Sequence, residues 1–251
     1  MTSAILLTLL LSPKLAVHPL GQSEQLVVVL TEHWDAPRGL LYPLERNGTR
    51  WMQAGPVLPV WVGRSGLGWR SDPGAPTPPA PGPSKQEGDG RAPAGILTFD
   101  ELWGYAEHAP AGVTLPYHAA GPLDRCVDDV KSADYNRLVK QTPASSWQSA
   151  ESLRLPTEHY KYLVVLGYNR SQPKPGAGSC IFFHVAPQPE QPTAGCTALP
   201  EAELLGILRW LQPTKQPRLL QVPRPLLPQI IRAWQLPAEL ASLPKGRPSP
   251  R

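Results

Sequence analysis

Three features that this chain of 251 residues lacks limit what it can be. No Arg/Lys cluster has aromatic residues interleaved along it, which argues against nucleic-acid binding. None of the three cysteines belongs to a C-x-x-C pair or a His/Cys cluster, so the sequence indicates no zinc site. Beyond the N-terminus, no apolar segment reaches the ~20 residues that a membrane-spanning helix needs. We therefore expect no nucleic-acid partner, no stable membrane span and no bound metal.

Proline is abundant, with 33 residues against an average usage of about 5%. Prolines interrupt helices and favour strands, turns and extended connections. Hydrophobic residues make up 41% of the chain, enough for a sizeable core in one large domain or two small ones. The formal net charge of +4 favours anionic partners, such as a polyanionic wall or a membrane surface.

Residues 1–18 are predicted to be an export signal. Their apolar core, Ala4 to Leu11, has eight residues and is too short to span a bilayer. The stretch before His18 lacks a clean A-x-A cleavage pattern, and no Lys or Arg precedes the apolar core. The alternative is a first core strand or helix. We expect the mature chain outside the cytoplasm, in the periplasm or cell envelope.

The cysteine count is odd, so in an oxidising compartment one thiol is left over. If Cys126 pairs with Cys180, Cys196 is the free thiol. If nothing pairs, Cys126 and Cys180 are small buried residues. The sequence alone leaves both possibilities open.

Compact segments rich in β-branched and apolar residues predict a mainly β fold. Asn47-Gly48 predicts a hairpin turn, and the opening third of the chain reads as a β-meander. The clearest helix covers residues 200–211, with Pro in its first turn, acidic residues next and its leucines on one face. A short amphipathic helix is expected around residues 230–234. The expected strands are 25–31, 40–46, 49–52, 57–62, 161–168, 180–185 and 217–222.

A proline-rich segment, residues 72–86, contains no large apolar residue. We expect it to be an extended, solvent-exposed insertion within the domain, the alternative being a domain linker. Residues 223–251 follow the last expected strand and form a C-terminal extension. We expect its tail, from Pro244 onward, to be disordered.

The most informative segment joins a histidine to a cysteine. A buried-looking apolar run ends at His184, and a short proline-rich loop then leads to the sequence T-A-G-C that ends at Cys196. Nucleophilic thiol chemistry needs a thiolate, a neighbouring base and backbone N–H groups that hold an oxyanion. We expect Cys196 just before the N-terminus of helix 200–211, where the helix dipole lowers a thiol pKa. The alternative is a structural cysteine beside a core histidine.

This segment and several others, taken in order, resemble the L,D-transpeptidase family of the YkuD type, in the branch that carries T-A-G-C. A lone T-A-G-C would mean little, but the ordered series is specific. Val185 stands where the family commonly has glycine, and Ala198 where it commonly has an arginine credited with substrate anchoring. The resembling segments are 63–69, 87–96, 115–117, 125–129, 132, 135–136, 147, 149–151, 168–169, 178–184 and 193–199.

The resemblance implies a catalytic domain over residues 25–222, folded as a curved β-sandwich with a helix next to the active-site loop. It implies acyl transfer on peptidoglycan stem peptides without a cofactor. A cysteine thiolate displaces D-alanine from a tetrapeptide, and an amine of a neighbouring stem then resolves the thioester. If water resolves it, the enzyme is an L,D-carboxypeptidase or amidase. An inactive wall-binding module is a third possibility, and the oligomeric state is left open.

The resemblance also assigns the site residues. Cys196 is the implied nucleophile and His184 the base, while Gly195 gives the loop room to turn. Thr193 stands in the place of a family serine and is expected to fix the loop by hydrogen bonds. The candidate substrate-binding residues are Thr193, Thr197, Tyr117 and Arg91.

Other polar residues are expected to have structural roles. Asp128 and Asp129 are predicted to cap a short helix, the alternative being a substrate amine. Glu87 and Asp89 lie among glycines and are predicted to fix a turn, the alternative being a cation or an amine. Tyr117 is expected in the groove or the core, and Arg91 beside a substrate carboxylate or Asp89. We expect Trp147 in the core, and four histidines at the surface: His33, His108, His118 and His159.

Overall fold

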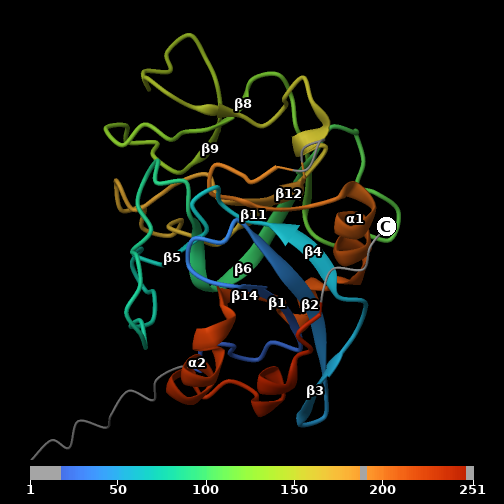
Figure 1. Ribbon diagram of the computed structural model, residues 1–251. Coiled ribbons are helices and arrows are strands. Elements are labelled where there is room, and N and C mark those ends of the chain that lie inside the picture. The colour runs from blue at the N-terminus through green and yellow to red at the C-terminus, as the bar shows by residue number, and fades with distance from the viewer. Residues whose placement is uncertain (1–17, 187–190, 247–251) are drawn as a thin grey trace, which may run out of the picture.

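A computed structural model describes residues 18–186 and 191–246 of the chain (Figure 1). Most of the predicted export signal and the end of the tail lie outside these residues. The strands are β1 (Gln25–Thr31), β2 (Arg38–Asn47), β3 (Arg50–Gln53), β4 (Leu58–Trp61), β5 (Leu67–Trp69), β6 (Ala92–Gly104), β7 (Tyr117–Ala119), β8 (Asp124–Cys126), β9 (Leu138–Lys140), β10 (Glu151–Ser152), β11 (Tyr162–Leu166), β12 (Phe182–Val185), β13 (Thr197–Leu199) and β14 (Arg218–Pro223). The α-helices are α1 (Glu201–Trp210) and α2 (Leu227–Trp234).

The predicted mainly β class is confirmed, with 33% strand and 14% helix. Strands of the main sheet follow one another in the order β1-β14-β6-β11-β12-β13-β4-β2, and β2 pairs again with β1. The strands therefore close into a ring. The expected β-meander is found only in part, because β1 pairs in parallel with β14, far along the chain. The Asn47-Gly48 hairpin is present between β2 and β3.

The interior of the ring is the main hydrophobic core. All seven residues of β1 are buried, because β2 and β14 flank the strand and side chains cover both of its faces. Helix α1 forms where it was predicted and buries Leu204, Ile207 and Leu208 against the sheet. Full burial of each of these side chains contributes about 1.5–3 kcal/mol. Figure 1 shows α1 beside β4, and the helix contacts β12 and β13.

A second, three-stranded sheet in the order β10-β8-β9 lies at one end of the ring (Figure 1). A disulfide joins its Cys126 to Cys180, the residue just before the segment that leads into β12. Of the two pairings that the sequence left open, the structure has Cys126–Cys180, and Cys196 is the free cysteine.

The proline-rich segment 72–86 is extended and largely solvent-exposed, as predicted, but Asp72, Ala80 and Lys85 within it are buried. Its backbone packs against a row of three tryptophans, Trp34, Trp69 and Trp234, whose rings meet edge to face at 5.0 and 5.9 Å. Trp69 Nε1 donates to the Ala80 carbonyl at 2.9 Å. The segment lacks large apolar side chains of its own and is held at the surface by these contacts with the tryptophans.

Part of the C-terminal extension also belongs to the core, since α2 buries Leu227, Ile230 and Trp234. Pro244, at the start of the tail that we expected to be disordered, accepts a hydrogen bond from the Tyr42 hydroxyl at 2.8 Å. The remainder of that tail, from residue 247, lies outside the described residues.

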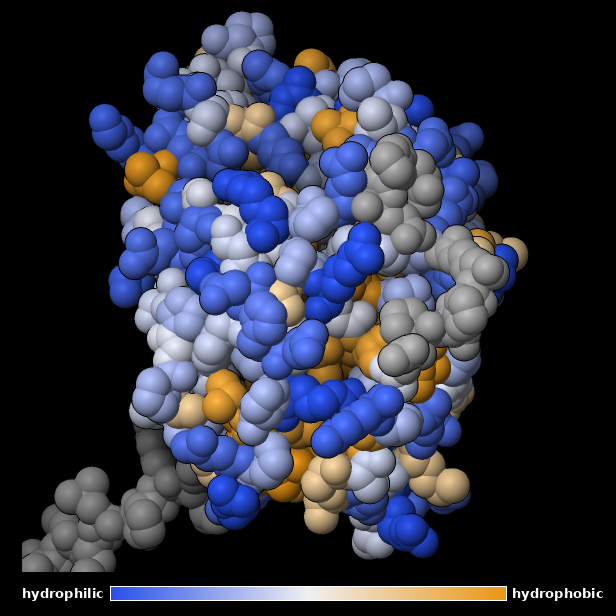
Figure 2. Space-filling view, viewed as in Figure 1, coloured by the Kyte–Doolittle hydropathy of each residue, from blue (hydrophilic) through white to orange (hydrophobic). Residues whose placement is uncertain are grey.

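The surface in Figure 2 is mostly hydrophilic, with smaller hydrophobic areas in its lower half. The large hydrophobic side chains that are exposed, Met52, Leu123 and Val130, are scattered. Within the described residues, no helix has both the length and the apolar character needed to cross a bilayer.

Candidate functional site

Cys196 directly precedes β13, which pairs in parallel with β12. Its sulfur accepts a hydrogen bond from the Phe182 N–H at 3.3 Å and donates to the Cys180 carbonyl at 3.4 Å. Cys180 lies two residues before β12, and Phe182 is the first residue of that strand. The side chain is buried, with 7% of its surface exposed. The residue expected to be the nucleophile is therefore a thiol largely shielded from solvent.

The expected helix N-terminus next to Cys196 is not found. The three residues of β13 intervene, and α1 begins only at Glu201. A strand rises about 3.3 Å per residue, which carries the helix dipole away from the sulfur. Burial raises the pKa of the Cys196 thiol well above its usual range, and the negative charge of Glu151 adds to this effect. The N–H of Phe182 and the charge of Lys85 oppose it. The thiol is therefore protonated at neutral pH.

His184, in β12, is buried, with 6% of its surface exposed, and burial lowers its pKa to about 4. Its Nδ1 lies 2.8 Å from the Val185 carbonyl. A carbonyl only accepts, so Nδ1 is the donor in this contact, and a backbone hydrogen bond with His159 also favours the protonated ring. The ring of Tyr160 packs edge to face on the imidazole, 5.2 Å between centroids. Neither of the two sulfur hydrogen bonds goes to His184.

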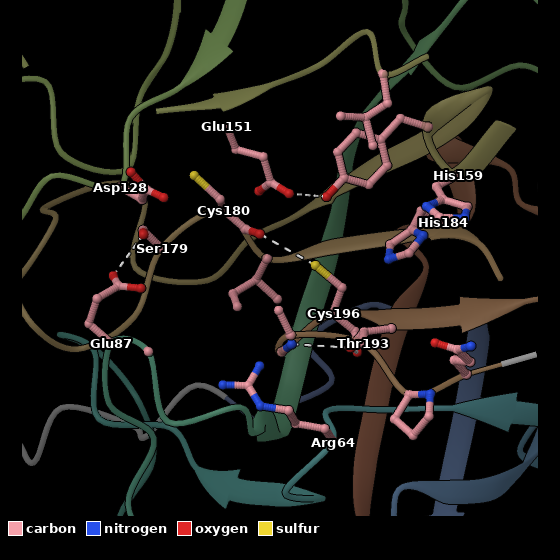
Figure 3. Close-up of a pocket in the computed structure, with 18 of the residues that line it drawn as sticks. Arg64, Glu87, Asp128, Glu151, His159, Ser179, Cys180, His184, Thr193 and Cys196 are labelled. Atoms are coloured by element: carbon pink, nitrogen blue, oxygen red, sulfur yellow. Dashed lines mark hydrogen bonds between the residues drawn. The ribbon is translucent and has the colours of Figure 1, made fainter. Parts of the chain in front are cut away.

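Cys196 and His184 share one cavity of about 700 Å³. Figure 3 shows them on the same side, with Glu151 above the sulfur and Glu87 and Asp128 across the opening. The structure thus brings the two predicted catalytic side chains into one pocket. Its other lining residues are Arg64, Lys85, Gly88, Leu155, His159, Tyr160, Ser179, Cys180, Ile181, Gln191, Pro192, Thr193, Ala194 and Gly195.

Three carboxylates, one lysine and one arginine, Arg64, give the cavity a mixed charge. Glu151 is largely buried, which raises its pKa to about 7, and it accepts a hydrogen bond from the Tyr160 hydroxyl. Glu87 accepts from the Ser179 hydroxyl at 2.7 Å. Lys85 is 3% exposed. Asp128 accepts from the Ser149 hydroxyl at 2.5 Å.

Sequence reasoning gave no role to Glu151, Tyr160 or Lys85. Glu151 stands within the ordered series of resembling segments, which is the signal that could have drawn attention to it. His159, expected at the surface, lines the cavity. His33, His108 and His118 are exposed, as predicted.

Thr193 fixes the loop before Cys196, as expected. Its hydroxyl donates to the Cys196 carbonyl at 2.7 Å and accepts from the Gly195 N–H at 3.1 Å. Its backbone pairs with Gly63, which ties the loop to the glycine-rich turn. At Gly195, an added Cβ would lie 3.1 Å from the Arg91 carbonyl. The loop can approach this segment so closely because residue 195 has no side chain.

Thr193→Val removes both hydroxyl contacts at nearly constant shape. We expect the free energy of unfolding in urea to fall by about 1–3 kcal/mol, because the carbonyl and N–H are left buried without partners. Thr193→Ser keeps the hydroxyl and serves as the control, with a loss below about 1 kcal/mol. Equal losses for the two variants would contradict a role for the hydroxyl.

Three of the four candidate substrate-binding residues do not reach this cavity. Thr197 is fully buried, and its hydroxyl donates to Gln221 Oε1 at 2.9 Å. The Tyr117 hydroxyl donates to the Ala106 carbonyl at 2.5 Å. The Arg91 guanidinium donates to the Leu67 carbonyl at 2.9 Å and pairs with Asp35 at 2.6 Å. Their side chains are thus engaged within the fold, and Thr193 is the candidate that lines the cavity.

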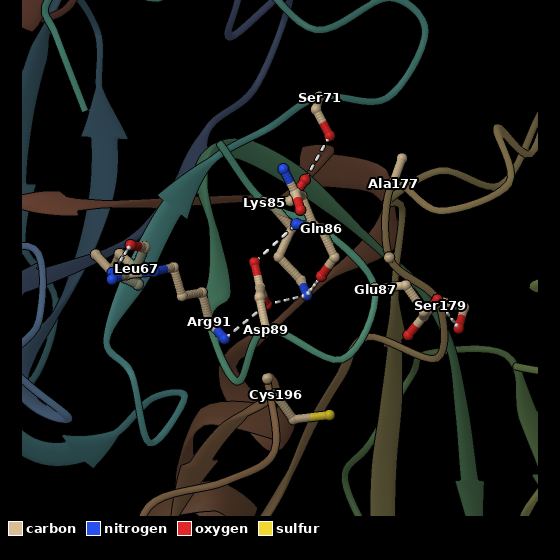
Figure 4. Close-up of polar contacts among 12 residues, drawn as sticks. Leu67, Ser71, Lys85, Gln86, Glu87, Asp89, Arg91, Ala177, Ser179 and Cys196 are labelled. Carbon is tan, nitrogen blue, oxygen red and sulfur yellow. Dashed lines mark hydrogen bonds and ion pairs between the residues drawn. The ribbon is translucent and has the colours of Figure 1, made fainter. Parts of the chain in front are cut away.

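The expected turn at Asp89 is present. Its Oδ1 accepts from Lys85 Nζ at 2.7 Å and from the Arg91 N–H at 2.9 Å, and its Oδ2 accepts from the Gln86 N–H at 2.7 Å (Figure 4). This turn directs Glu87 toward Ser179 and the cavity.

The expected helix after Asp128 and Asp129 does not form. Residues 130–135 are turns, and Asp129 instead accepts from the N–H groups of Lys131 and Gln148, at 2.9 and 2.8 Å. Trp147, expected in the core, is only partly buried, and it belongs to the loop between β9 and β10.

A search for related proteins returned no matching family model, curated protein or solved structure. Among the described residues, no group of three or more His, Cys, Asp or Glu side chains is arranged to hold a metal ion.

Proposed function

We propose that this chain is a peptidoglycan L,D-transpeptidase with Cys196 as its nucleophile and His184 as its base. The observation that carries the proposal is that the free thiol lines a cavity of about 700 Å³ together with a buried histidine, His184, whose Nδ1 lies 2.8 Å from the Val185 carbonyl. The resemblance of the ordered sequence segments to the YkuD-type family, and hence a fold of that type, belongs to the same proposal.

In the proposed reaction, the Cys196 sulfur attacks the carbonyl of the third residue of a stem tetrapeptide while its proton moves to His184 Nε2. That proton is then given to the departing D-alanine amine, and a thioester remains. The Gly195 N–H is engaged by Thr193, so we assign the oxyanion to the Cys196 N–H. An amine from a second stem releases the acyl group and forms the cross-link.

The cavity suits such a substrate in two respects. Its volume admits a peptide segment, and Glu87, Asp128 and Glu151 favour the amino groups that stem peptides carry. The disulfide Cys126–Cys180 is of the kind that forms in oxidising compartments, which supports export to the periplasm or cell envelope.

The test is incubation of the purified chain with disaccharide tetrapeptides, followed by mass spectrometry of the products and of the protein. The proposal expects release of D-alanine, an acyl adduct on the Cys196 peptide and cross-linked dimers. Tripeptide monomers without dimers would identify an L,D-carboxypeptidase. If a folded protein gave no product and no adduct, the enzymatic proposal would be overturned and a wall-binding module would be favoured.

A further inference from the structure

The segment that holds the Cys196 sulfur begins at a residue with an unusual backbone. Cys180 has φ +52°, the left-handed region that residues with a side chain rarely adopt. Such a conformation costs on the order of 1–3 kcal/mol and persists only when neighbouring contacts impose it. In the structure, two contacts do so: the disulfide to Cys126, and a hydrogen bond from the Cys180 N–H to Asn136 Oδ1 at 2.9 Å.

Asn136 is itself fixed from several directions. It is 4% exposed, and its Nδ2 donates to the carbonyls of Tyr168 and Asn169 at 3.0 and 2.6 Å. The side chain therefore joins three segments that are distant in sequence: the loop after β8, the loop after β11 and the entry to β12. Asn136 also has positive φ, at +59°.

The consequence appears at the sulfur. Cys180 supplies the carbonyl that accepts from the thiol, and Phe182, two residues later, supplies the N–H that donates to it. Rotation of residue 180 out of the left-handed region would turn its carbonyl away from Cys196.

We propose that Asn136 and the Cys126–Cys180 disulfide are positioning groups, which hold the 180–182 backbone against the Cys196 thiol. The inference rests on the proposed function for its catalytic meaning, since it names what places the nucleophile. The contact itself is a property of the folded chain and can be tested without substrate.

The test uses the S–H stretching band, which in this protein comes from Cys196 alone because the other two cysteines are bonded to each other. A hydrogen-bonded thiol absorbs at lower frequency than a free one. Asn136→Gly keeps the left-handed backbone available and removes the side chain. We expect its band to move to higher frequency and to broaden. Gln216→Gly, at an exposed residue with φ +46°, is the matched control and leaves the band unchanged.

The paired substitution Cys126→Ala with Cys180→Ala also leaves Cys196 as the sole thiol and is expected to shift the band in the same direction. This double variant tests the positioning role if circular dichroism shows that Asn136→Gly does not fold. An unchanged band in either folded variant would overturn the inference. If the wild-type protein is active, we further expect Asn136→Gly to lower kcat at least about tenfold with little change in KM. If the wild type shows no turnover, the proposed function is contradicted, whereas the infrared test of the positioning groups still holds.

Discussion

Replacement of Cys196 by alanine is expected to eliminate D-alanine release, lowering kcat by on the order of 10⁴–10⁶-fold. The variant retains the cavity and its other lining residues but has no atom that can form the thioester. His184→Gln is expected to lower kcat by about 10²–10⁴-fold, because the protonated, buried thiol then lacks its base. The effects of substituting residues that act as one unit are not additive. The double variant with Cys196→Ala and His184→Gln should therefore be no slower than Cys196→Ala alone.

Both measurements need folded protein and a histidine control. His118→Gln provides the control, since His118 is exposed and pairs with Glu101 outside the cavity. Its turnover should match that of the wild type. If Cys196→Ala released D-alanine at the wild-type rate, or if no acyl adduct formed on Cys196 during turnover, the assigned nucleophile would be wrong.

A second large effect is expected in the pH dependence of stability. Burial raises the pKa of Glu151 from 4.5 to about 7, so the folded chain retains a proton that the unfolded chain releases. This contribution makes the free energy of unfolding fall as the pH rises from 4.5 to about 7. Burial lowers the pKa of His184 from 6.5 to about 4, so its contribution falls as the pH drops from 6.5 to about 4.

The two contributions oppose each other over almost the same interval. Each corresponds to about 3 kcal/mol, at 1.36 kcal/mol per unit of pKa shift, and they largely cancel in the wild type between pH 4.5 and 6.5. Relative to the wild type, Glu151→Gln should gain stability as the pH rises through this interval. His184→Gln should gain stability as the pH falls through it.

Denaturant unfolding at several pH values measures both effects, and the difference from the wild type removes the contributions of other groups. Gln at position 151 still accepts from the Tyr160 hydroxyl, so its contact is preserved while its titration is lost. Parallel curves for Glu151→Gln and the wild type would show that this carboxyl ionises in the folded chain as it does in water.

Much of the local structure could be predicted because it depends on short sequence patterns. The Asn47-Gly48 hairpin, α1 and the strands β1, β11 and β12 follow from turn chemistry and periodicity. The sharing of one cavity by Cys196 and His184 could be predicted as well, since a short loop joins two neighbouring strands.

The remainder depends on contacts between distant residues. Closure of the sheet needs β1 beside β14, and the segment 72–86 is held in part by Trp234, from the far end of the chain. Glu151 reaches the cavity because β10 pairs with β8. The pKa of the thiol was expected in the wrong direction, because three residues of strand separate Cys196 from the helix and burial then dominates.

The parallel pairing of β1 with β14 also constrains the order of folding. Leu26 pairs with Arg218 and Thr31 with Pro223, so the first strand of the ring has one neighbour nearby and the other almost two hundred positions later. Contacts of such long sequence separation slow folding, because a large loop must close before they form. A chain that emerges N-terminus first therefore keeps one edge of β1 open until β14 arrives, and the cavity between β12, β13 and the small sheet gains its supporting ring only at that late stage.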